Sequence, residues 1–433
     1  MKLLVTLEMR FSRTRDGQVW TRTTYGYPYW KRYLNVFDGV KVVARAERKD
    51  TVDDEFRPVC GPGVEFVEVP YYCGPRQYVQ VRRRVRETLM AAVRNQDAVI
   101  CRVASHLAMD LLPVLWDSGR PYGLEVVADP HEVFAPGATQ HALRSLFRYL
   151  FTRALEQQCL RAAAVSYVTE RALQRRYPAR ENGFAIAVSD AELPPVSFSD
   201  VPRVFTTYYS STDLSLDDYV AEPKEFALPV RPRLVFVGTL AQLYKGQDVL
   251  LRAVALLKER QLPVELRIIG EGKHRLELES LSRALSLDGV VSFVGELPAG
   301  AAVRAELDNA TVLVLPSRTE GLPRVIVEAM ARGLPCVATS VGGIPELLHP
   351  DDLVPSNDHQ ALANKIQSVI CDPSRLNQMS ERNLEKAQEF RPDCLENRRT
   401  EFYQFLKTVT AAWMSHGKHK SYPVFAPQNC KGT

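Results

Sequence analysis

The chain has 433 residues, a length that predicts two or three domains, each large enough to bury its own core. Apolar residues make up 45% and charged residues 24%, the mix of a globular protein, and no stretch approaches the ~20 uncharged apolar residues of a membrane span. The eight cysteines occur singly, without a C-x-x-C pair. This argues against a zinc ribbon and favours a reducing compartment such as the cytoplasm.

The net charge is +4, and a large part of the positive excess lies in residues 71–94. A local basic patch holds an anionic membrane surface or a phosphate-bearing substrate, or it is only a solvated helix face. We keep both interpretations open and place the acceptor or membrane side of the protein on this stretch. Nothing in the chain resembles a nucleic-acid-binding module, so no nucleic-acid partner is expected. The cations of the stretch, which face the single acid Glu87, are Arg76, Arg82, Arg83, Arg84, Arg86 and Arg94.

Short apolar runs alternate with helical patterns through both halves of the chain. Strands that are buried on both faces of a parallel sheet give such continuous runs instead of an alternating pattern. Because strand and helix alternate twice over, the sequence predicts two doubly wound α/β domains. The strands expected in the first half are residues 3–7, 40–44, 64–69, 98–103, 124–128, 165–169, 185–188 and 204–208. Those expected in the second half are residues 234–237, 264–269, 290–294, 311–315 and 335–338.

We expect a first domain over residues 1–213 and a second over 232–392, joined by a hinge linker over 214–231 with prolines and mixed charge. Residues 142–164 carry an amphipathic pattern that predicts a helix packed on the core rather than on a membrane. The final residues, 414–433, are expected to form a flexible tail. The apolar positions of the predicted helix are 143, 146, 147, 150, 151, 154 and 155.

Two loops of the second half carry glycine and a cation directly after a predicted strand. The first strand ends at Gly238, and Lys245 stands before the next helix, where a phosphate lies in open α/β sheets. The second strand ends at Gly270, and Gly272 follows, so the backbone turns sharply and approaches a ligand closely. Turn chemistry alone explains these glycines about as well.

The most informative stretch follows the predicted strand 311–315. A loop over 316–321 leads into a helix that begins near Pro323, so Glu320 stands just before the helix and Glu328 about two turns inside it. The free N–H groups at the start of the helix form an anion site, with one carboxylate at its mouth and one along its wall. Carboxylates accept hydrogen bonds from vicinal hydroxyls, so a sugar or a ribose is the natural ligand. A pair with a nearby arginine is the structural alternative for Glu328, but its apolar neighbours favour a ligand.

At these residues the chain resembles the retaining GT-B glycosyltransferases of family 4, which use nucleotide sugars, and the spacing of the two glutamates, E-x7-E, is the specific motif. The resemblance implies two Rossmann-like domains facing across a cleft and a final helix, 393–413, that crosses back to the first domain. It also implies that Glu320 contacts hydroxyls of the donor sugar, Glu328 the ribose and Lys245 the diphosphate. The other donor-binding residues that it implies are Gly238, Thr239, Gly270, Gly272, Val294, Arg318, Gly321 and Leu322.

Two features depart from the pattern of that family. The position after Gly238 usually holds an arginine for the diphosphate, and here it is Thr239. The glycine-rich first loop of the first domain is also absent. The family often has a histidine that approaches the reacting carbon of the donor; His131 is the nearest match, and Asp129 fits the spacing nearly as well. The candidates to replace the missing cation are Arg318, Lys273 and Arg275.

The resemblance implies transfer of a sugar to an acceptor hydroxyl with retained configuration, with Glu320, Lys245 and His131 at the reacting centre. We expect no metal and no cofactor besides the nucleotide sugar as co-substrate, because protein groups hold the leaving diphosphate. The acceptor that such enzymes most often use is a lipid-linked saccharide of a cell-surface polysaccharide, reached at the inner face of the cell membrane. A soluble transferase for a small metabolite, a nucleotide-sugar epimerase and a non-catalytic sugar-binding subunit are the alternatives.

Overall fold

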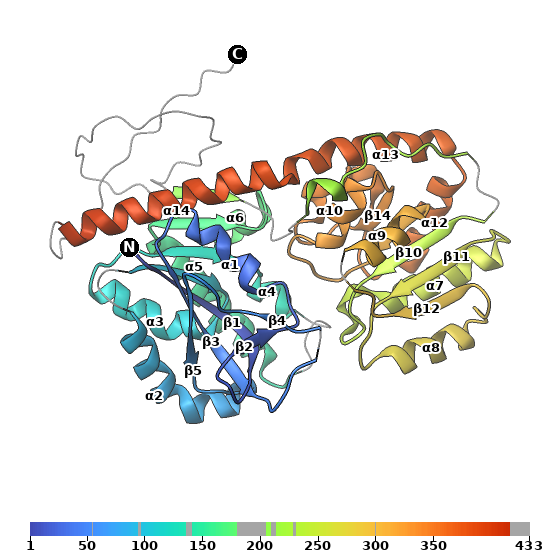
Figure 1. The fold of residues 1–433 in the computed structure, drawn as a ribbon. Helices are drawn as coiled ribbons and strands as arrows, with labels where there is room; N and C mark the ends of the chain where they lie inside the picture. Colours follow the sequence, from blue (N-terminus) through green and yellow to red (C-terminus); the bar gives the residue numbers. More distant parts are fainter. Residues whose placement is uncertain are drawn as a thin grey trace, which may run out of the picture.

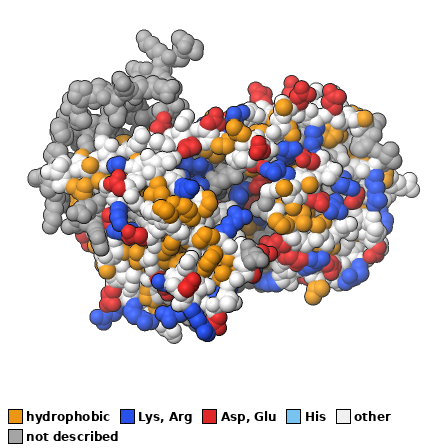
Figure 2. All heavy atoms as spheres, in the orientation of Figure 1, with side chains coloured by type: hydrophobic (Ala, Val, Ile, Leu, Met, Phe, Trp, Pro, Cys, Tyr) orange, Lys and Arg blue, Asp and Glu red, His pale blue; other side chains and the backbone are white. Residues whose placement is uncertain are grey.

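The computed structural model describes residues 1–53, 55–93, 97–135, 141–179, 205–208, 214–227, 231–298 and 300–415. They form two α/β domains side by side, and the long helix α14 (Pro392–Ser415) runs from the second domain along the first (Figure 1). The space-filling view shows a furrow between the two domains, with Lys and Arg side chains along it (Figure 2). The predicted GT-B architecture is therefore confirmed.

The first domain is built on a parallel sheet with the strand order β5-β3-β1-β6-β7-β8-β9, while the short β2 and β4 pair antiparallel beside the far end of β1. Seven of the eight strands predicted for this half are confirmed, and the eighth, 185–188, lies outside the described residues. The short antiparallel pair was not predicted because it has no apolar run of its own. The strands are β1 (Leu3–Arg13), β2 (Val19–Thr21), β3 (Val40–Arg48), β4 (Arg57–Pro58), β5 (Val64–Val69), β6 (Ala98–Val103), β7 (Gly123–Val126), β8 (Ala164–Tyr167) and β9 (Phe205–Tyr208).

Helices cover both faces of this sheet. On one face α2, α3 and α5 bury side chains such as Val85, Leu111 and Leu155 against the strands. On the other face α1 and α14 bury Trp30 and Phe402. Each central strand is thus covered on both sides, which explains its uninterrupted apolar sequence. The helices are α1 (Tyr27–Leu34), α2 (Gly74–Ala92), α3 (His106–Asp117), α4 (Pro130–Val133), α5 (Arg144–Arg161) and α6 (Ala172–Arg176).

The helix predicted over 142–164 is α5, but its apolar stripe divides between the core and the surface. Leu155 is buried, whereas Leu143, Leu146 and Leu150 are 52%, 49% and 44% exposed. The predicted packing of this helix on the core is therefore confirmed for its buried residues, but not for the outer edge of the stripe. The stripe is wider than the face of the helix that meets the sheet, so the side chains at its outer edge stay in solvent.

The second domain is a six-stranded parallel sheet in the order β12-β11-β10-β13-β14-β15. All five strands predicted for this half are confirmed, and the two-residue β15 is the addition. Its strands are β10 (Arg233–Val237), β11 (Glu265–Ile269), β12 (Val291–Gly295), β13 (Val312–Leu315), β14 (Cys336–Thr339) and β15 (Leu353–Val354). Its helices are α7 (Gln247–Glu259), α8 (Arg275–Ala284), α9 (Ala301–Asp308), α10 (Arg324–Ala331), α11 (Ile344–Leu347), α12 (His359–Ile370) and α13 (Pro373–Ala387). The 3-10 turns of the molecule are η1 (Leu216–Asp218), η2 (Leu243–Lys245), η3 (Pro350–Asp352) and η4 (Gln388–Phe390).

The described part of the predicted linker, 214–227 and 231, lies along the second domain. The Lys224 ammonium donates to the carbonyl oxygen of Leu307 at 2.9 Å, and burial is the main cause that lowers its pKa to about 8. Asp218 forms an ion pair with Arg304 of α9. These contacts fix the described part of the segment on the second domain; the hinge linker over 214–231 and the boundary at residue 213 stay predictions.

The helix α14 joins the domains a second time, because it returns from the second domain to the first. The Asn35 side-chain amide donates to Glu396 at 2.8 Å, and the Lys407 ammonium donates to the carbonyl oxygen of Val36 at 2.6 Å. The predicted crossover helix 393–413 is thereby confirmed. Residues 416–433 of the predicted tail lie outside the described residues.

Candidate active site

The loop between β13 and α10 carries Glu320 to the cleft edge of the second domain. The Ser317 hydroxyl donates to Glu320 Oε1 at 2.6 Å, and the Thr339 hydroxyl on β14 donates to the Ser317 carbonyl oxygen at 2.6 Å. Pro323 caps the helix with its fixed φ of −72°, so α10 begins at the next residue. The glutamate therefore stands, only 7% exposed, beside the unpaired N–H groups of a helix start.

Lys245 reaches the same carboxylate from η2, in the loop that follows the neighbouring strand β10. Its Nζ lies 2.6 Å from Glu320 Oε1, and the two side chains are 15% and 7% exposed. The next residue, Gly246, has a φ of +75°, and a Cβ there would lie 2.0 Å from the Pro316 carbonyl oxygen. Only glycine fits, so the loops after β10 and β13 touch each other through their backbones. The sequence thus predicted both charged groups but not that they pair.

The other predicted glycines are also sites of close backbone approach. A Cβ on Gly270, with φ of +140°, would lie 2.0 Å from the Gly238 carbonyl oxygen, and one on Gly272 would lie 2.0 Å from the Ala241 nitrogen. A Cβ on Gly342 would lie 1.9 Å from the Glu320 carbonyl oxygen. The glycines therefore bring the loops after β10, β11, β13 and β14 together at one edge of the sheet.

Glu328 lies on α10, one side of which is buried among apolar residues. Burial is the main cause that raises its pKa, and the Arg324 guanidinium, 3.9 Å away, only partly opposes it. The other candidate partner, Arg332, is taken by Asp308 at 2.7 Å. Within the part of the chain that the structure describes, the Glu328 carboxylate accepts no hydrogen bond. A half-buried carboxylate with unused acceptor capacity is suited to a hydroxylated ligand.

At the position of the missing arginine, Thr239 makes a local turn instead of a phosphate contact. Its hydroxyl accepts a hydrogen bond from the Ala241 amide at 3.1 Å. The Arg318 guanidinium forms a double hydrogen bond with Asp248 at 2.8 and 2.9 Å and so holds the loop to α7. Arg275 pairs with two glutamates of its own segment. Of the three candidate replacements, Lys273 alone is exposed and has no ion pair among the described residues.

The start of α10 faces the first domain. A Cβ on Gly321 would lie 3.8 Å from the Val127 carbonyl oxygen, just after β7, and Leu322 packs against buried residues of both domains. Val294, in β12, is half-buried at the far side of the same edge of the sheet. The predicted donor residues thus lie in the loops and strand ends at one edge of the second sheet, with Glu328 on the helix that follows, although the Arg318 side chain is bound to Asp248. We call this edge, around Lys245, Glu320 and Gly321, the donor corner.

His131 and Asp129 occupy the loop after β7, and their contacts differ. Asp129 is buried, accepts from the His131 amide at 2.9 Å and the Tyr177 hydroxyl at 2.5 Å, and pairs with Arg176. The hydrogen-bonding capacity of the Asp129 carboxylate is therefore taken up by residues of the first domain. The His131 ring is 37% exposed, with Nδ1 3.0 Å from an Arg148 nitrogen. The geometry therefore favours His131 over Asp129 as the group that is available to a ligand.

One contact that joins the domains was not predicted from the sequence. The Glu346 carboxylate on α11 accepts hydrogen bonds from the amides of Glu170, Arg171 and Ala172 at 2.6, 3.0 and 2.6 Å. These amides stand at the start of α6 in the first domain. The residues are more than 170 positions apart, so no local pattern announces the contact. It holds the two domains together beside the donor corner.

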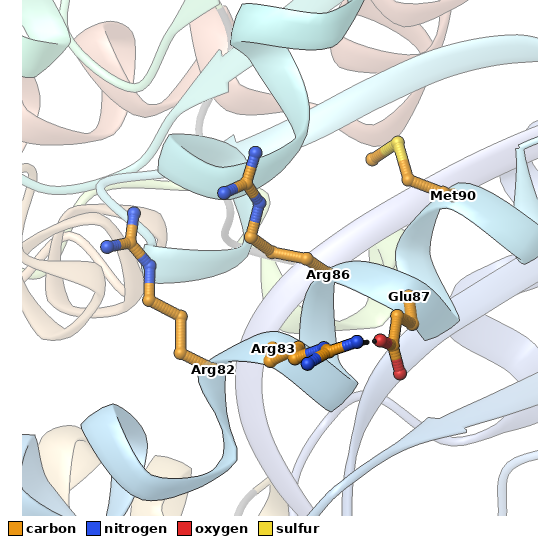
Figure 3. A pocket seen from close by; sticks show the side chains of 5 residues that line it. All are labelled: Arg82, Arg83, Arg86, Glu87 and Met90. Carbon is orange, nitrogen blue, oxygen red and sulfur yellow. Dashed lines mark hydrogen bonds and ion pairs between the residues drawn. The ribbon is translucent and has the colours of Figure 1, made fainter.

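The basic stretch is the outer face of α2 (Figure 3). Arg82 reaches Asp110 of α3 at 2.9 Å, and Arg83 pairs with Glu87 at 3.0 Å. Arg82, Arg83, Arg86, Glu87 and Met90 line an open hollow of about 590 Å³. Arg84 is exposed outside that hollow, and Arg94 lies outside the described residues. The four predicted arginines thus share one helix, and only part of their charge is neutralised.

In the described residues, no three or more His, Cys, Asp or Glu side chains are grouped as metal ligands. No helix in that part of the chain is long and apolar enough to cross a membrane.

Comparison with known proteins shows what this chain is similar to. Residues 231–372 match the family described as "Glycosyl transferases group 1". Protein CapJ of Staphylococcus aureus is 23% identical over 80% of this chain and 81% of its own length. The putative colanic acid biosynthesis glycosyltransferase WcaL of Escherichia coli K12 is 38% identical, but over only 33% of this chain and 37% of its own length. The predicted resemblance to family 4 glycosyltransferases is thereby confirmed.

Solved structures agree in fold over almost the whole chain. Sucrose-phosphate synthase from Thermosynechococcus elongatus superimposes with a TM-score of 0.66 at 18% identity, covering 95% of this chain and 100% of its own. Anabaena HepE in complex with UDP and glucose gives a TM-score of 0.62 at 17% identity, with 93% and 98% covered. At these identities the likeness shows the fold.

Proposed function

We propose that this chain, whose residues 231–372 form a group 1 glycosyltransferase domain within a GT-B fold, transfers a sugar from a nucleotide sugar to a saccharide acceptor with retained configuration. The observation that carries the proposal is the pair of Lys245 and Glu320, 2.6 Å apart, beside the free amides at the start of α10. A cation, a carboxylate and a helix N-terminus at one point match the diphosphate and the sugar hydroxyls of such a donor. The UDP and glucose bound to HepE, a neighbour in fold, support that choice of ligand.

In the proposed mechanism, the donor takes the place of the internal ion pair. The diphosphate lies on Lys245 and on the amides of Gly321 and Leu322, which frees the Glu320 carboxylate for hydroxyls of the transferred sugar. Glu328 accepts hydrogen bonds from the ribose. As the glycosyl bond breaks, charge grows on the diphosphate, and the preorganised cation and amides stabilise it. The same diphosphate takes the proton of the acceptor hydroxyl on the same face, and His131 contacts the donor from the first domain.

Thermal unfolding with UDP, GDP, ADP and dTDP tests this proposal. A nucleotide at a hundred times its dissociation constant stabilises the fold by ~2.7 kcal/mol, and we expect one of the four to do so. With the matching nucleotide sugar, transfer should continue in EDTA, because protein groups neutralise the diphosphate. No stabilisation by any of the four, or activity that only Mg²⁺ or Mn²⁺ restores, would overturn the mechanism.

We further propose that the acceptor is a lipid-linked saccharide, used in cell-surface polysaccharide synthesis at the inner face of the cell membrane. Eight of the eleven exposed large hydrophobic side chains in the described residues lie between Val79 and Leu160, on or beside α2, α3, α4 and α5. Lys and Arg side chains gather along the edge of the molecule where α2 lies (Figure 2). Exposed apolar residues next to cations are typical of peripheral membrane binding, with ~1 kcal/mol per cation at an anionic surface. The colanic acid role in the name of WcaL supports the polysaccharide part.

Vesicle co-sedimentation distinguishes this acceptor from a small metabolite. Wild-type protein should sediment with phosphatidylglycerol vesicles, and replacing Arg82, Arg83 and Arg86 together by glutamine should release it. Equal recovery of both proteins in the supernatant would favour the soluble transferase.

A further inference from the structure

A second polar cluster lies in the first domain, outside the donor corner. Its members come from four separate segments: β1, β3, the end of β5 and the start of α3. The Glu8 carboxylate is at the centre. It accepts a hydrogen bond from the Tyr72 hydroxyl at 3.0 Å and from the Leu107 amide at 3.2 Å, and it lies 2.9 Å from an Arg45 nitrogen. His106 Nδ1 lies 3.7 Å from Glu8 Oε1.

This cluster stands where the strand order of the first sheet reverses. β1 pairs with β3 on one side and with β6 on the other, so the chain moves outward through β3 and β5 and then returns to the opposite side through β6 and β7. Ligands of open α/β sheets bind beyond the carboxyl ends of the strands at such a switch point. Glu8 lies in β1 just past the part of that strand that pairs with β6, and His106 is the first residue of α3, three positions after the end of β6.

The place of this cluster in the strand order also brings it near the donor corner. Neighbouring strands lie ~4.8 Å apart, so the end of β6 is about that far from the end of β7. Val127, just after β7, is the residue that Gly321 of the second domain approaches. His106 follows β6, the strand next to β7, so the cluster and the start of α10 lie at neighbouring strands of the same sheet edge.

Charge and exposure indicate what this cluster would bind. Burial raises the pKa of Glu8, but His106, Arg45 and the Leu107 amide outweigh it, so the net pKa is lowered and the carboxylate is ionised. Tyr72 is buried, whereas the His106 side chain is 32% exposed, and its Nε2 has no partner among the described residues. An ionised carboxylate disfavours a second anion, so a neutral, hydroxylated group is the better ligand.

The imidazole of His106 is also held in a fixed orientation by aromatic rings. Its ring centre lies 4.6 Å from that of Tyr78 on α2 and 4.9 Å from that of Phe151 on α5. With Glu8 at Nδ1 and rings on two sides, the Nε2 edge is the part of the imidazole left for a ligand. Aromatic walls beside a polar edge are suited to the apolar face and the hydroxyls of a sugar.

We infer that the Glu8–His106 cluster is the subsite for the acceptor sugar, in which His106 contacts an acceptor hydroxyl and Glu8 is a positioning residue that orients the imidazole. This inference rests on the proposed function. It assigns the sugar part of the acceptor to the switch point and leaves any diphosphate or lipid of the acceptor to the basic and apolar surface of α2 and α5.

Binding of three simple probes tests the inference: octyl glucoside, octyl galactoside and octyl N-acetylglucosaminide, followed by saturation-transfer NMR in the presence of the diphosphate nucleotide. At least one probe should bind the wild type, and His106→Ala should weaken it by roughly three- to ten-fold, the loss of one hydrogen bond. His106→Gln, which restores a polar edge, should recover part of that loss. The matched control His349→Gln, on the second domain away from both sites, should bind the probes as the wild type does.

Glu8→Gln separates positioning from mere support of the fold. The amide keeps the shape and still accepts from Tyr72, so the chain should stay folded at the assay temperature, with some stability lost because Glu8 no longer pairs with Arg45, while probe binding weakens. Unchanged binding in His106→Ala and Glu8→Gln, or no binding of any probe to the wild type, would overturn the acceptor subsite. Nucleotide-induced stabilisation is the separate readout: it should persist in every variant, and its absence in the wild type would instead contradict the proposed function.

Discussion

The two domains place polar clusters at the same structural position, the carboxyl ends of parallel strands, but they build them differently. In the second domain, Lys245 and Glu320 stand on loops whose backbones touch, at distances that only glycine allows. In the first domain, Glu8 and His106 are held by side-chain hydrogen bonds and aromatic rings. The donor corner therefore depends on backbone close approach, whereas the first-domain cluster depends on its side-chain partners.

We expect the largest loss of stability and activity from a variant that blocks one of these close backbone approaches. In Gly342→Ala the new Cβ would lie 1.9 Å from the Glu320 carbonyl oxygen, at a φ of +55°. The loop that holds Glu320 must move, so we expect a loss of stability of more than about 2 kcal/mol and no measurable transfer. Chemical unfolding and a transfer assay measure the two losses.

Gly289→Ala is the matched control for that variant. Gly289 has a φ of +71° but open space around its Cβ position. It should lose only about 1 kcal/mol, the strain of the left-handed backbone, and keep its activity. If both alanine variants behave alike, close approach is not what maintains the donor corner.

The same contrast explains how much the sequence alone could predict. The donor corner is local: Gly238, Lys245, Glu320 and Glu328 lie in one contiguous domain, each directly after a strand or on the helix that follows. Strand and helix patterns therefore sufficed to place them at one edge. The pairing of Lys245 with Glu320 was not predictable, because two loops 75 residues apart had to be brought together by glycine contacts.

The first domain gave weaker signals because its contacts join distant segments. Glu8 and Leu107 are 99 residues apart, and their hydrogen bond follows from the sheet order rather than from any motif. For the exposed leucines of α5 the sequence predicted more burial than the structure shows. An amphipathic pattern reveals that one face of a helix is apolar, but not how much of that face is covered. The order of strands in a sheet and the width of the helix face that the sheet covers are both set by tertiary packing, so a local sequence pattern does not reveal them.

The next effect in size concerns the charged pair itself. Lys245→Ala removes the cation that matches the family's diphosphate-binding lysine, and charge-assisted hydrogen bonds contribute ~1.5–3 kcal/mol. The catalytic efficiency kcat/KM should fall by roughly ten- to a hundred-fold, because both donor affinity and turnover decrease.

Glu320→Gln should lower kcat strongly while the free diphosphate nucleotide binds almost normally, because the hydrogen bonds of Glu320 to the transferred sugar strengthen as that sugar becomes cationic.

Lys258→Ala provides the control for a lost lysine. Lys258 is on the same domain, at the end of α7, and among the described residues its ammonium donates to the Ser286 carbonyl oxygen alone. Its kinetics should match the wild type. Wild-type kinetics in Lys245→Ala would show that the diphosphate does not bind at Lys245. A Glu320→Gln enzyme that loses nucleotide affinity would show that the roles of Glu320 and Glu328 are exchanged.

The smallest effect is expected at Glu328, where the contact is the same in the ground state and in the transition state. Glu328→Gln should weaken binding of the diphosphate nucleotide by roughly three- to ten-fold near pH 7.5 and leave kcat almost unchanged, because uniform binding does not raise turnover.

Burial raises the pKa of Glu328, so its protonated form appears at a higher pH than for an exposed glutamate. Ribose hydroxyls donate to the ionised form, so wild-type affinity should fall as the pH falls through that raised pKa. Glutamine does not titrate, and titration calorimetry between about pH 5 and 8 should therefore show the two proteins converging towards the acidic end. A difference that stays constant with pH would mean that another group, and not the Glu328 carboxylate, contacts the nucleotide.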